Sequence, residues 1–256
     1  MTQTTRVSLE PAWILHQHPY RDSSLLLEVF SREYGRIGLV ARGARSARSR
    51  SRNQLQILRP LALSWSLRGE LGTLTGVESR GAVDIFPGRQ ILCACYLNEL
   101  LLRLMTRHDP HPGIFDAYEQ AIMMLGMNEE QALRVFEKRL LESLGYGLLL
   151  EHEFDSGTPV REDLLYEYHL ERGPVRCQQT GDAGIFLHGS SLLALHRDEL
   201  QESQICREVK RLMRAALALY LGARPLRTRE VLRQLSVMSH AGQRETVATA
   251  ANQGTG

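Results

Sequence analysis

The periodicity of the sequence changes at Phe86-Pro87-Gly88, and this change constrains the fold more than any other feature of the chain. Before it, over residues 12–78, apolar and polar residues alternate with the period of β-strands, and turn residues interrupt the pattern at short intervals. The clearest strand is 61–67, which Arg68-Gly69-Glu70 turns into the strand 71–78. After it, apolar residues recur with the period of helices. The pattern predicts an α+β protein whose strands come first.

The strand-like region is short for the number of strands that it holds. Residues 12–17 precede a second pair, 25–30 and 36–42, which flanks a turn at 31–35. Five such strands bury little as a flat sheet, whereas closure into a barrel removes the open edges and encloses a core. We therefore expect residues 1–82 to form a five-stranded oligonucleotide/oligosaccharide-binding (OB) barrel, with an SH3-like barrel as the structural alternative.

The second region, residues 83–238, is expected to be mostly helical. Its best-defined helix has Asn128 as a cap and Gln131 three residues later. A stretch of mixed, strand-like character at about residues 151–189 predicts a small insertion, and the small and polar residues of 239–256 predict a disordered tail. The predicted helices span residues 89–108, 112–125, 128–144, 190–195, 205–221 and 228–235.

Positive charge is concentrated near the N-terminus. The formal net charge is only +2, but residues 1–80 hold 12 arginines against six acidic residues, which leaves 19 basic and 23 acidic residues for the rest of the chain. The barrel region therefore carries +6 and the remainder −4. Eight arginines and no acidic residue lie between Gly35 and Gly69. This one-sided pattern favours an anionic partner over the alternative, a merely solvated loop, which could use charges of either sign.

Within that segment, residues 42–52 alternate arginine with Gly, Ala and Ser, none of which anchors a chain in a core. The pattern predicts a mobile loop, and guanidinium groups on such a loop suit phosphate because they are permanently charged and bind it bidentately. Single-strand binders add aromatic faces, for which Trp13, Tyr34 and Trp65 are available, although Trp65 alternates with two leucines and fits a core position better. The candidate DNA-binding residues are Arg36, Arg42, Arg45, Arg48, Arg50 and Arg52.

Catalytic motifs are absent from the sequence. It contains neither the glycine-rich motifs that hold phosphates nor the G-x-S-x-G nucleophile elbow of hydrolases. Cys93 and Cys95 point to different helix faces, and His108 and His111 lie in a proline-containing linker between predicted helices. We expect no enzyme, no cofactor and no metal. Because the chain shows neither the apolar core of a signal peptide nor the run of roughly 20 apolar residues that a membrane span needs, we expect a cytoplasmic protein.

Short motifs are spread along almost the whole chain in a fixed order. Near the N-terminus they are Trp13-Ile-Leu-His16, Arg21-Asp-Ser-Ser-Leu-Leu-Leu27 and Gly35-Arg-Ile-Gly-Leu-Val-Ala-Arg-Gly-Ala-Arg45. Further on they are Tyr96-Leu-Asn-Glu-Leu100, Ala132-Leu-Arg-Val-Phe-Glu137, Leu144-Gly-Tyr-Gly147 and Tyr220-Leu-Gly-Ala-Arg-Pro-Leu226, followed by Arg229-Glu230. In order and spacing, these motifs resemble the RecO family of bacterial recombination mediators over about residues 10–235.

The resemblance implies an OB barrel and a helical domain that act in DNA repair by homologous recombination. Members of the family bind single- and double-stranded DNA, anneal complementary strands and, with their partner RecR, help load the recombinase RecA onto strands covered by single-stranded DNA-binding protein. They also dock the acidic C-terminal tail of that binding protein on the helical domain, where an arginine of the Ala-Leu-Arg motif contributes. The matching residue is Arg134. The resemblance thus implies a nucleoid-associated protein with these partners.

Arg134 and Lys138 lie four residues apart on the polar flank of the best amphipathic helix, and we expect both to bind the tail. A basic ledge beside an apolar groove suits an acidic and apolar peptide, whereas a solvated helix face is the alternative. Some family members carry a four-cysteine zinc site in the insertion, where this chain has only Cys177. Two other functions stay open: a scaffold whose arginines engage acidic proteins, and an RNA-binding barrel.

Overall fold

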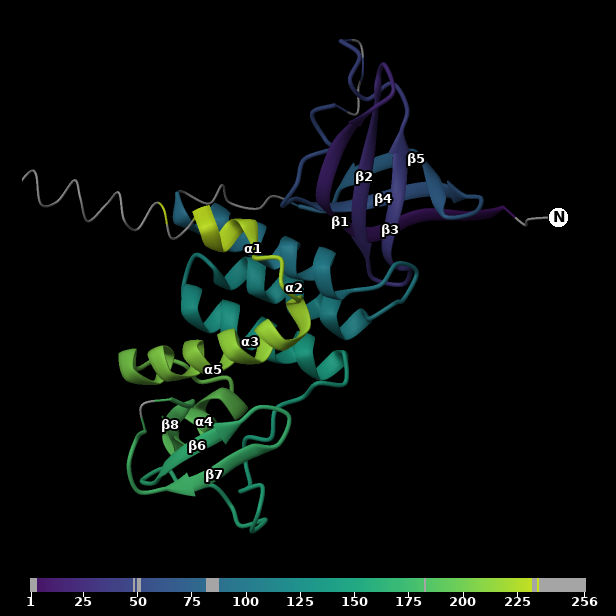
Figure 1. Ribbon diagram of the computed structural model, residues 1–256. Coiled ribbons are helices and arrows are strands. Elements are labelled where there is room, and N and C mark those ends of the chain that lie inside the picture. Colours follow the sequence, from purple (N-terminus) through teal and green to yellow (C-terminus); the bar gives the residue numbers. More distant parts are fainter. Residues whose placement is uncertain are drawn as a thin grey trace, which may run out of the picture.

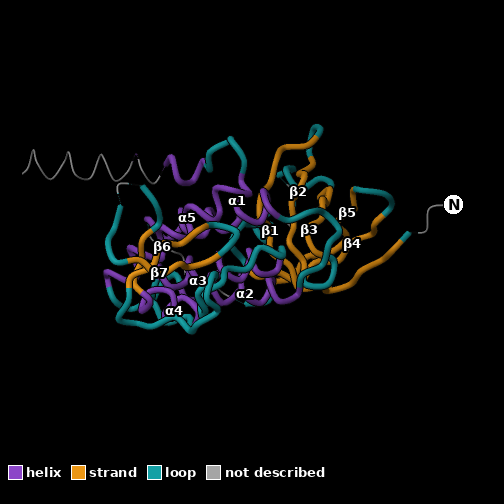
Figure 2. Tube along the Cα trace, turned by 60° about the horizontal axis from the view of Figure 1, so that its bottom comes forward, coloured by secondary structure: helices purple, strands orange, loops and turns teal. Residues whose placement is uncertain are grey.

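The computed structural model describes residues 4–47, 49, 52–81, 88–181, 183–231 and 234. It contains a five-stranded barrel, a group of helices beside the barrel and a small sheet on the far side of the helices (Figure 1). Figure 2 shows the same order from another side, with strands toward both ends of the molecule and helices between them. The predicted disordered tail, residues 239–256, lies outside the described residues. Within the described part of the chain, no helix is long and apolar enough to cross a bilayer.

The N-terminal strands close into a barrel with the order β1-β2-β3-β5-β4, in which β4 also pairs with β1. Neighbouring strands are antiparallel except β3 and β5, which are parallel. This is the five-stranded Greek-key order of an OB fold, so the predicted fold class is confirmed. The strands are β1 (Thr5–Tyr20), β2 (Ser24–Ser31), β3 (Gly35–Ala41), β4 (Pro60–Leu67) and β5 (Leu71–Ser79).

The first strand, β1, is much longer than the prediction of residues 12–17. Its first half pairs with β4 and its second half with β2, so that one strand serves two neighbours in turn. Register shifts between Val7 and Glu10 and between Ile14 and His16 break the two-residue alternation on which the prediction rested. The predicted strand length was therefore wrong because the irregularities hide most of β1 from a test of periodicity.

The helices begin within two residues of the predicted positions. The first helix ends four residues earlier than predicted, because residues 105–108 leave it and approach β3, where the amide of His108 donates to the carbonyl of Arg36 (2.9 Å). The last predicted helix, 228–235, is described only in part, and its described residues, 228–231 and 234, are helical. The named helices are α1 (Arg89–Leu104), α2 (Pro112–Met124), α3 (Glu129–Ser143), α4 (Gly189–His196) and α5 (Ser203–Leu221).

The small sheet beyond the helices contains three antiparallel strands in the order β7-β6-β8, and α4 follows it directly. A carboxylate of α5 joins the sheet to the helices. Glu208 accepts hydrogen bonds from the backbone amide of His188 (2.8 Å) and from the hydroxyl of Ser191 (2.7 Å). The strands are β6 (Leu165–His169), β7 (Gly173–Cys177) and β8 (Phe186–His188).

Both tryptophan side chains are buried, each with 1% of its surface exposed. Trp65 lies inside the barrel, and the ring of Tyr34 meets it edge-on at 5.3 Å between centroids. Trp13 points out of the barrel into the helical core, where it packs edge-on against Tyr118 of α2 and donates its indole N–H to Glu119 (3.0 Å). Neither indole therefore offers a free face to a nucleobase.

Close contacts at the polypeptide backbone fix the barrel against the helices. The side-chain amide of Asn98 in α1 donates to the carbonyl of Leu15 in β1 (3.0 Å). Gly35, at the start of β3, has a φ of +64° and lies so close to the loop after α1 that a Cβ there would collide with the carbonyl oxygen of Asp109. Since only glycine meets both conditions without strain, this residue helps to set the position of the barrel.

Candidate nucleic-acid interface and cationic pocket

The arginine-rich segment forms the long connection from β3 to β4, at the end of the barrel away from the helices (Figure 1). It is anchored at several points. Ala44 and Leu55 are buried in the barrel core, and the amide of Arg45 donates to the carbonyl of Ser23 in the turn between β1 and β2 (2.8 Å). The guanidinium of Arg45 also lies beside that turn, where it donates to the carbonyl of Arg21 (3.3 Å). Its exposed arginines in the described part are Arg42, Arg45 and Arg52.

The other candidate arginines have different positions. Arg48 and Arg50 lie outside the described residues. Arg36 lies at the junction of barrel and helices, where it donates to the carbonyl of Leu102 and its Nε is 3.8 Å from a carboxylate oxygen of Glu28. Its side chain is only 17% exposed. The structure thus places Arg36 apart from the exposed arginines of the loop.

A row of rings on the barrel surface escaped the sequence analysis. His16, His18 and Tyr20 alternate along the second half of β1, and the two histidines are exposed. The aromatic residues predicted to face a nucleobase were the tryptophans and Tyr34, which are buried or half-buried in the structure. The signal that could have revealed the row is the His-x-His-x-Tyr pattern itself, which places three rings on one face of a strand.

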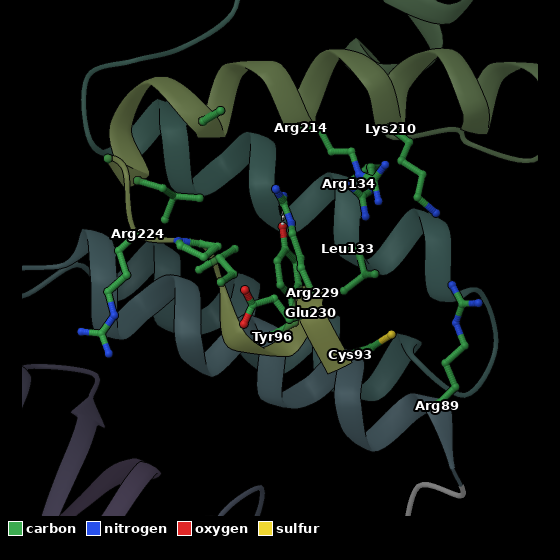
Figure 3. Close-up of a pocket in the computed structure, with 15 residues that line it drawn as sticks. Arg89, Cys93, Tyr96, Leu133, Arg134, Lys210, Arg214, Arg224, Arg229 and Glu230 are labelled. Carbon is green, nitrogen blue, oxygen red and sulfur yellow. Dashed lines mark hydrogen bonds between the residues drawn. The ribbon is translucent and has the colours of Figure 1, made fainter. Parts of the chain in front are cut away.

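A pocket of about 700 Å³ opens between α1, α3, α5 and the segment that follows α5 (Figure 3). Leu133, Leu221 and Leu226 contribute to its apolar lining. Of the charged residues that line it in the described part of the chain, six are basic and only Glu230 is acidic. An apolar floor with a positive rim suits a peptide that carries both carboxylates and apolar side chains. The basic residues are Arg89, Arg134, Lys210, Arg214, Arg224 and Arg229.

Arg134 lies in the wall of this pocket and is only 4% exposed. Its Nη1 donates to Glu137 (2.7 Å), whose other carboxylate oxygen accepts from the hydroxyl of Tyr96 (2.5 Å). Arg229, on the segment after α5, donates to the same hydroxyl (2.9 Å; Figure 3). Burial alone would lower the pKa of Arg134, but Glu137, Tyr96 and Glu130 together raise it. The guanidinium is therefore a fixed positive charge inside a hydrogen-bonded network.

Lys138 lies elsewhere, although it is one helical turn from Arg134. Its Nζ donates to the carbonyls of Leu195 (2.9 Å) and His196 (3.0 Å) and is 2.6 Å from a carboxylate oxygen of Asp198. The ammonium group thus caps the C-terminus of α4, where positive charge is favourable. It is absent from the lining of the pocket, so the structure does not bring the two predicted tail-binding residues together.

Two basic residues of the pocket are free to meet a ligand. Arg89, Arg134 and Lys210 each pair with a glutamate, whereas Arg214 and Arg224 are exposed and form no ion pair with any residue that the structure describes. Arg214 is not among the site residues predicted from the sequence, although its spacing from Lys210 on a predicted helix could have indicated a basic stripe.

A metal site is not formed in the described part of the chain, where no three residues among His, Cys, Asp and Glu are grouped to hold an ion. The described cysteines are all free. Cys93 lines the pocket, but burial raises the pKa of its thiol to about 12, with Glu129 as a further cause. At neutral pH this thiol is protonated and therefore a poor nucleophile.

Taken together, the fold and these sites define a class of protein: an OB barrel with an arginine-rich loop, mounted on a helical region that holds a separate cationic pocket. Comparison with known sequences identifies the family. The models described as "Recombination protein O N terminal" and "Recombination protein O C terminal" match residues 6–82 and 88–230. The chain belongs to the RecO family, and its role lies in DNA repair and recombination.

Curated relatives agree with this assignment over nearly their full length. A protein of Nitrosococcus oceani is 43% identical over 94% of this chain and 98% of its own. A protein of Alkalilimnicola ehrlichii is 48% identical over 90% of this chain and 93% of its own length. A protein of Azoarcus sp. is 42% identical over 92% of this chain and 99% of its own length. Each is named DNA repair protein RecO.

Proposed function

We propose that this protein binds single- and double-stranded DNA through the arginine loop, anneals complementary strands and, with RecR, helps load the recombinase RecA onto strands covered by single-stranded DNA-binding protein. In this proposal, the acidic C-terminal tail of the binding protein docks in the cationic pocket. The proposal refines the role in DNA repair and recombination that family membership gives.

The observation that carries the DNA-binding part is the loop itself. Eight arginines without an acidic residue occur between Gly35 and Gly69. Arg42, Arg45 and Arg52 are exposed, and Arg45 is hydrogen-bonded to the turn between β1 and β2. Each guanidinium that meets a phosphate releases condensed counterions, which favours binding at low salt. Because phosphates are common to all DNA, this contact supports binding without sequence preference.

Annealing follows from charge neutralisation and proximity. The pairing of complementary strands is itself downhill, so no nucleotide hydrolysis is needed. The repulsion between two phosphate backbones opposes the encounter, and a loop with several guanidinium groups reduces that repulsion while it holds one strand near the other. The protein thus lowers the barrier to pairing without taking part in the pairing chemistry.

The pocket supports the recruitment part of the proposal. Arg214 and Arg224, which form no ion pair with any residue that the structure describes, can present their guanidinium groups to carboxylates of a peptide. Leu133 with its apolar neighbours offers a surface to the peptide's apolar side chains. Arg134 contributes a fixed positive charge from the wall rather than a mobile contact. An acidic tail that also carries apolar residues matches both features.

Annealing of oligonucleotides covered by single-stranded DNA-binding protein tests the proposal. We expect this protein to accelerate annealing, and to do so less when the binding protein lacks its C-terminal tail. The double substitution Arg214→Ala, Arg224→Ala should weaken acceleration only when the tail is present, whereas Arg207→Ala, an exposed arginine of α5 outside the pocket, should behave as wild type. Acceleration that is the same with and without the tail would contradict the docking step, and no acceleration would contradict the proposal as a whole.

A further inference from the structure

Three ring side chains form a ladder on the outer face of β1. His16, His18 and Tyr20 are two residues apart, so they point to the same side of the strand at intervals of about 6–7 Å. The imidazoles of His16 and His18 lie 4.1 Å apart between centroids, with 40° between their planes. Both histidines are exposed and Tyr20 is half-buried. In this ladder, the two imidazoles therefore contact each other and are also exposed to solvent.

The ladder lies on the part of the barrel that OB folds commonly use for ligands. On the neighbouring strand β2, the residues opposite His16 and His18 are Glu28 and Leu26, whose side chains share the same outer face. Leu26 is in turn opposite Val40 of β3. The rings thus border the face of β2 and β3, which is the ligand-binding face of many OB barrels.

Positive charge lies at the loop end of the ladder. The guanidinium of Arg21 lies 5.2 Å from the centre of the Tyr20 ring. Arg45 of the arginine loop donates from its guanidinium to the carbonyl of Arg21 (3.3 Å). The ladder therefore continues directly into the arginine loop, at the end of the barrel away from the helices (Figure 1).

The helical end of the ladder is also basic. Glu28, which faces His16, is neutralised by Arg36 and by Arg107 from the loop after α1. The pKa of His16 is lowered by burial and by the neighbouring His18 and Arg227. Glu28 acts in the opposite direction, but its effect is smaller than the sum of the others. At pH 7 the His16 ring is accordingly neutral, a state in which it offers a flat face rather than a charge.

We propose that His16, His18 and Tyr20 form a stacking platform for the unpaired bases of single-stranded DNA, which extends the arginine loop along the barrel toward the helices. The inference rests on the proposed function and names the residues that distinguish a single strand from a duplex. Every base has a π-face that stacks on a ring, but in a duplex those faces are covered by neighbouring bases. The loop binds phosphates of either form, whereas the ladder binds only exposed bases.

Binding of the full-length protein to three DNA probes of equal length tests the platform: a thymidine oligonucleotide, a strand with abasic sites in place of the thymidines, and a duplex. We expect wild type to bind the thymidine strand about tenfold more tightly than the abasic strand. The double substitution His16→Ala, His18→Ala should lose most of that preference and leave the affinities for the abasic strand and the duplex unchanged. The double substitution His16→Phe, His18→Phe should retain the preference for the thymidine strand over the abasic strand, because an aromatic ring remains at both positions.

Two controls separate stacking from a change in structure or charge. Gln17→Ala alters an exposed residue between the two histidines, and it should bind all probes as wild type does. The slope of log affinity against log salt should not change in the histidine variants, because stacking of a base on a ring neutralises no phosphate and releases no counterions. Equal wild-type affinity for intact and abasic strands would overturn the platform while leaving the proposed function intact. Absence of binding to every probe would overturn both.

Discussion

At the scale of single residues, Arg134 shows how burial changes the meaning of a charged side chain. It lines the pocket, yet it is 4% exposed and holds Glu137, which is itself fully buried, in an ion pair. Removing one member of such a pair leaves an uncompensated charge in a low-dielectric environment. Arg134 is therefore part of the architecture of the pocket before it is a contact for any ligand.

This arrangement predicts that Glu137→Ala is strongly destabilising. The substitution removes the carboxylate that is hydrogen-bonded to Arg134 and leaves Tyr96 without its hydrogen-bond acceptor, which should lower the free energy of unfolding by about 3–5 kcal/mol. Urea denaturation measures the loss. Glu142→Ala, an exposed residue of the same helix α3, should change stability by less than about 0.5 kcal/mol. Similar losses in the two variants would contradict a structural role for the buried pair.

At the scale of elements, Glu208 of α5 caps the N-terminus of a different helix, α4. Its carboxylate accepts from the amide of His188 and the hydroxyl of Ser191, at the first turn of α4, and it contacts the imidazole of His188 (2.8 Å). A negative charge at this position is favourable because the first amides of a helix have no partner within it. One side chain thus ties α4, β8 and α5 together.

This cap predicts an acid-sensitive contribution to stability. Burial would raise the pKa of Glu208, but hydrogen bonds from Ser191 and His188 outweigh it and lower the pKa below the ordinary value. A lowered pKa in the folded state stabilises the protein above the unfolded-state pKa of about 4.3, and the stabilisation is lost as the pH falls through the folded-state pKa. The free energy of unfolding of wild type should therefore exceed that of Glu208→Gln by about 1–3 kcal/mol at pH 7.

Thermal denaturation from pH 7 to pH 3 checks this expectation. The stability difference between wild type and Glu208→Gln should shrink as the pH falls below about 4. Glu199→Gln serves as the control, because it alters an exposed carboxylate near the same helix. A difference between wild type and Glu208→Gln that is constant over the whole range would show that the charge of Glu208 does not support the cap.

Elements with strong local signals were predictable from the sequence, whereas contacts between distant elements were not. Asn128 accepts a hydrogen bond from the amide of Gln131 (3.1 Å), as the capping pattern predicts, because both partners lie within one turn. Lys138 could not be placed in this way, since its carbonyl partners are 57 and 58 residues further along the chain. The helical periodicity predicts on which face of α3 Lys138 lies, but the residues that this face contacts depend on tertiary packing.

At the scale of the whole molecule, the barrel and the helices form one continuous structure. Trp13 joins the helical core, Asn98 reaches back to β1, and Gly35 lies against the loop after α1. The arginine loop and the ring ladder are on the barrel, while the cationic pocket is on the helical region. The junction therefore sets how a strand on the barrel is placed relative to a protein tail in the pocket.

Two glycine substitutions test the junction. Gly35→Ala combines a positive φ with a collision against Asp109, whereas Gly69→Ala has a φ of +81° and open space around the new Cβ. The second should cost only about 1 kcal/mol, the penalty of the backbone conformation, and the first should cost clearly more. Urea denaturation compares the two. Equal costs would contradict a tight contact between β3 and the loop after α1.

The salt dependence of binding to single-stranded DNA tests the central claim, that the arginine loop binds phosphate. If four to six arginines contact phosphates, log affinity should fall against log salt with a slope of about −3 to −4 for wild type. The quadruple substitution of Arg42, Arg45, Arg48 and Arg50 by Ala should weaken binding and make the slope shallower by about 2–3. An unchanged affinity and slope in that variant would contradict the account.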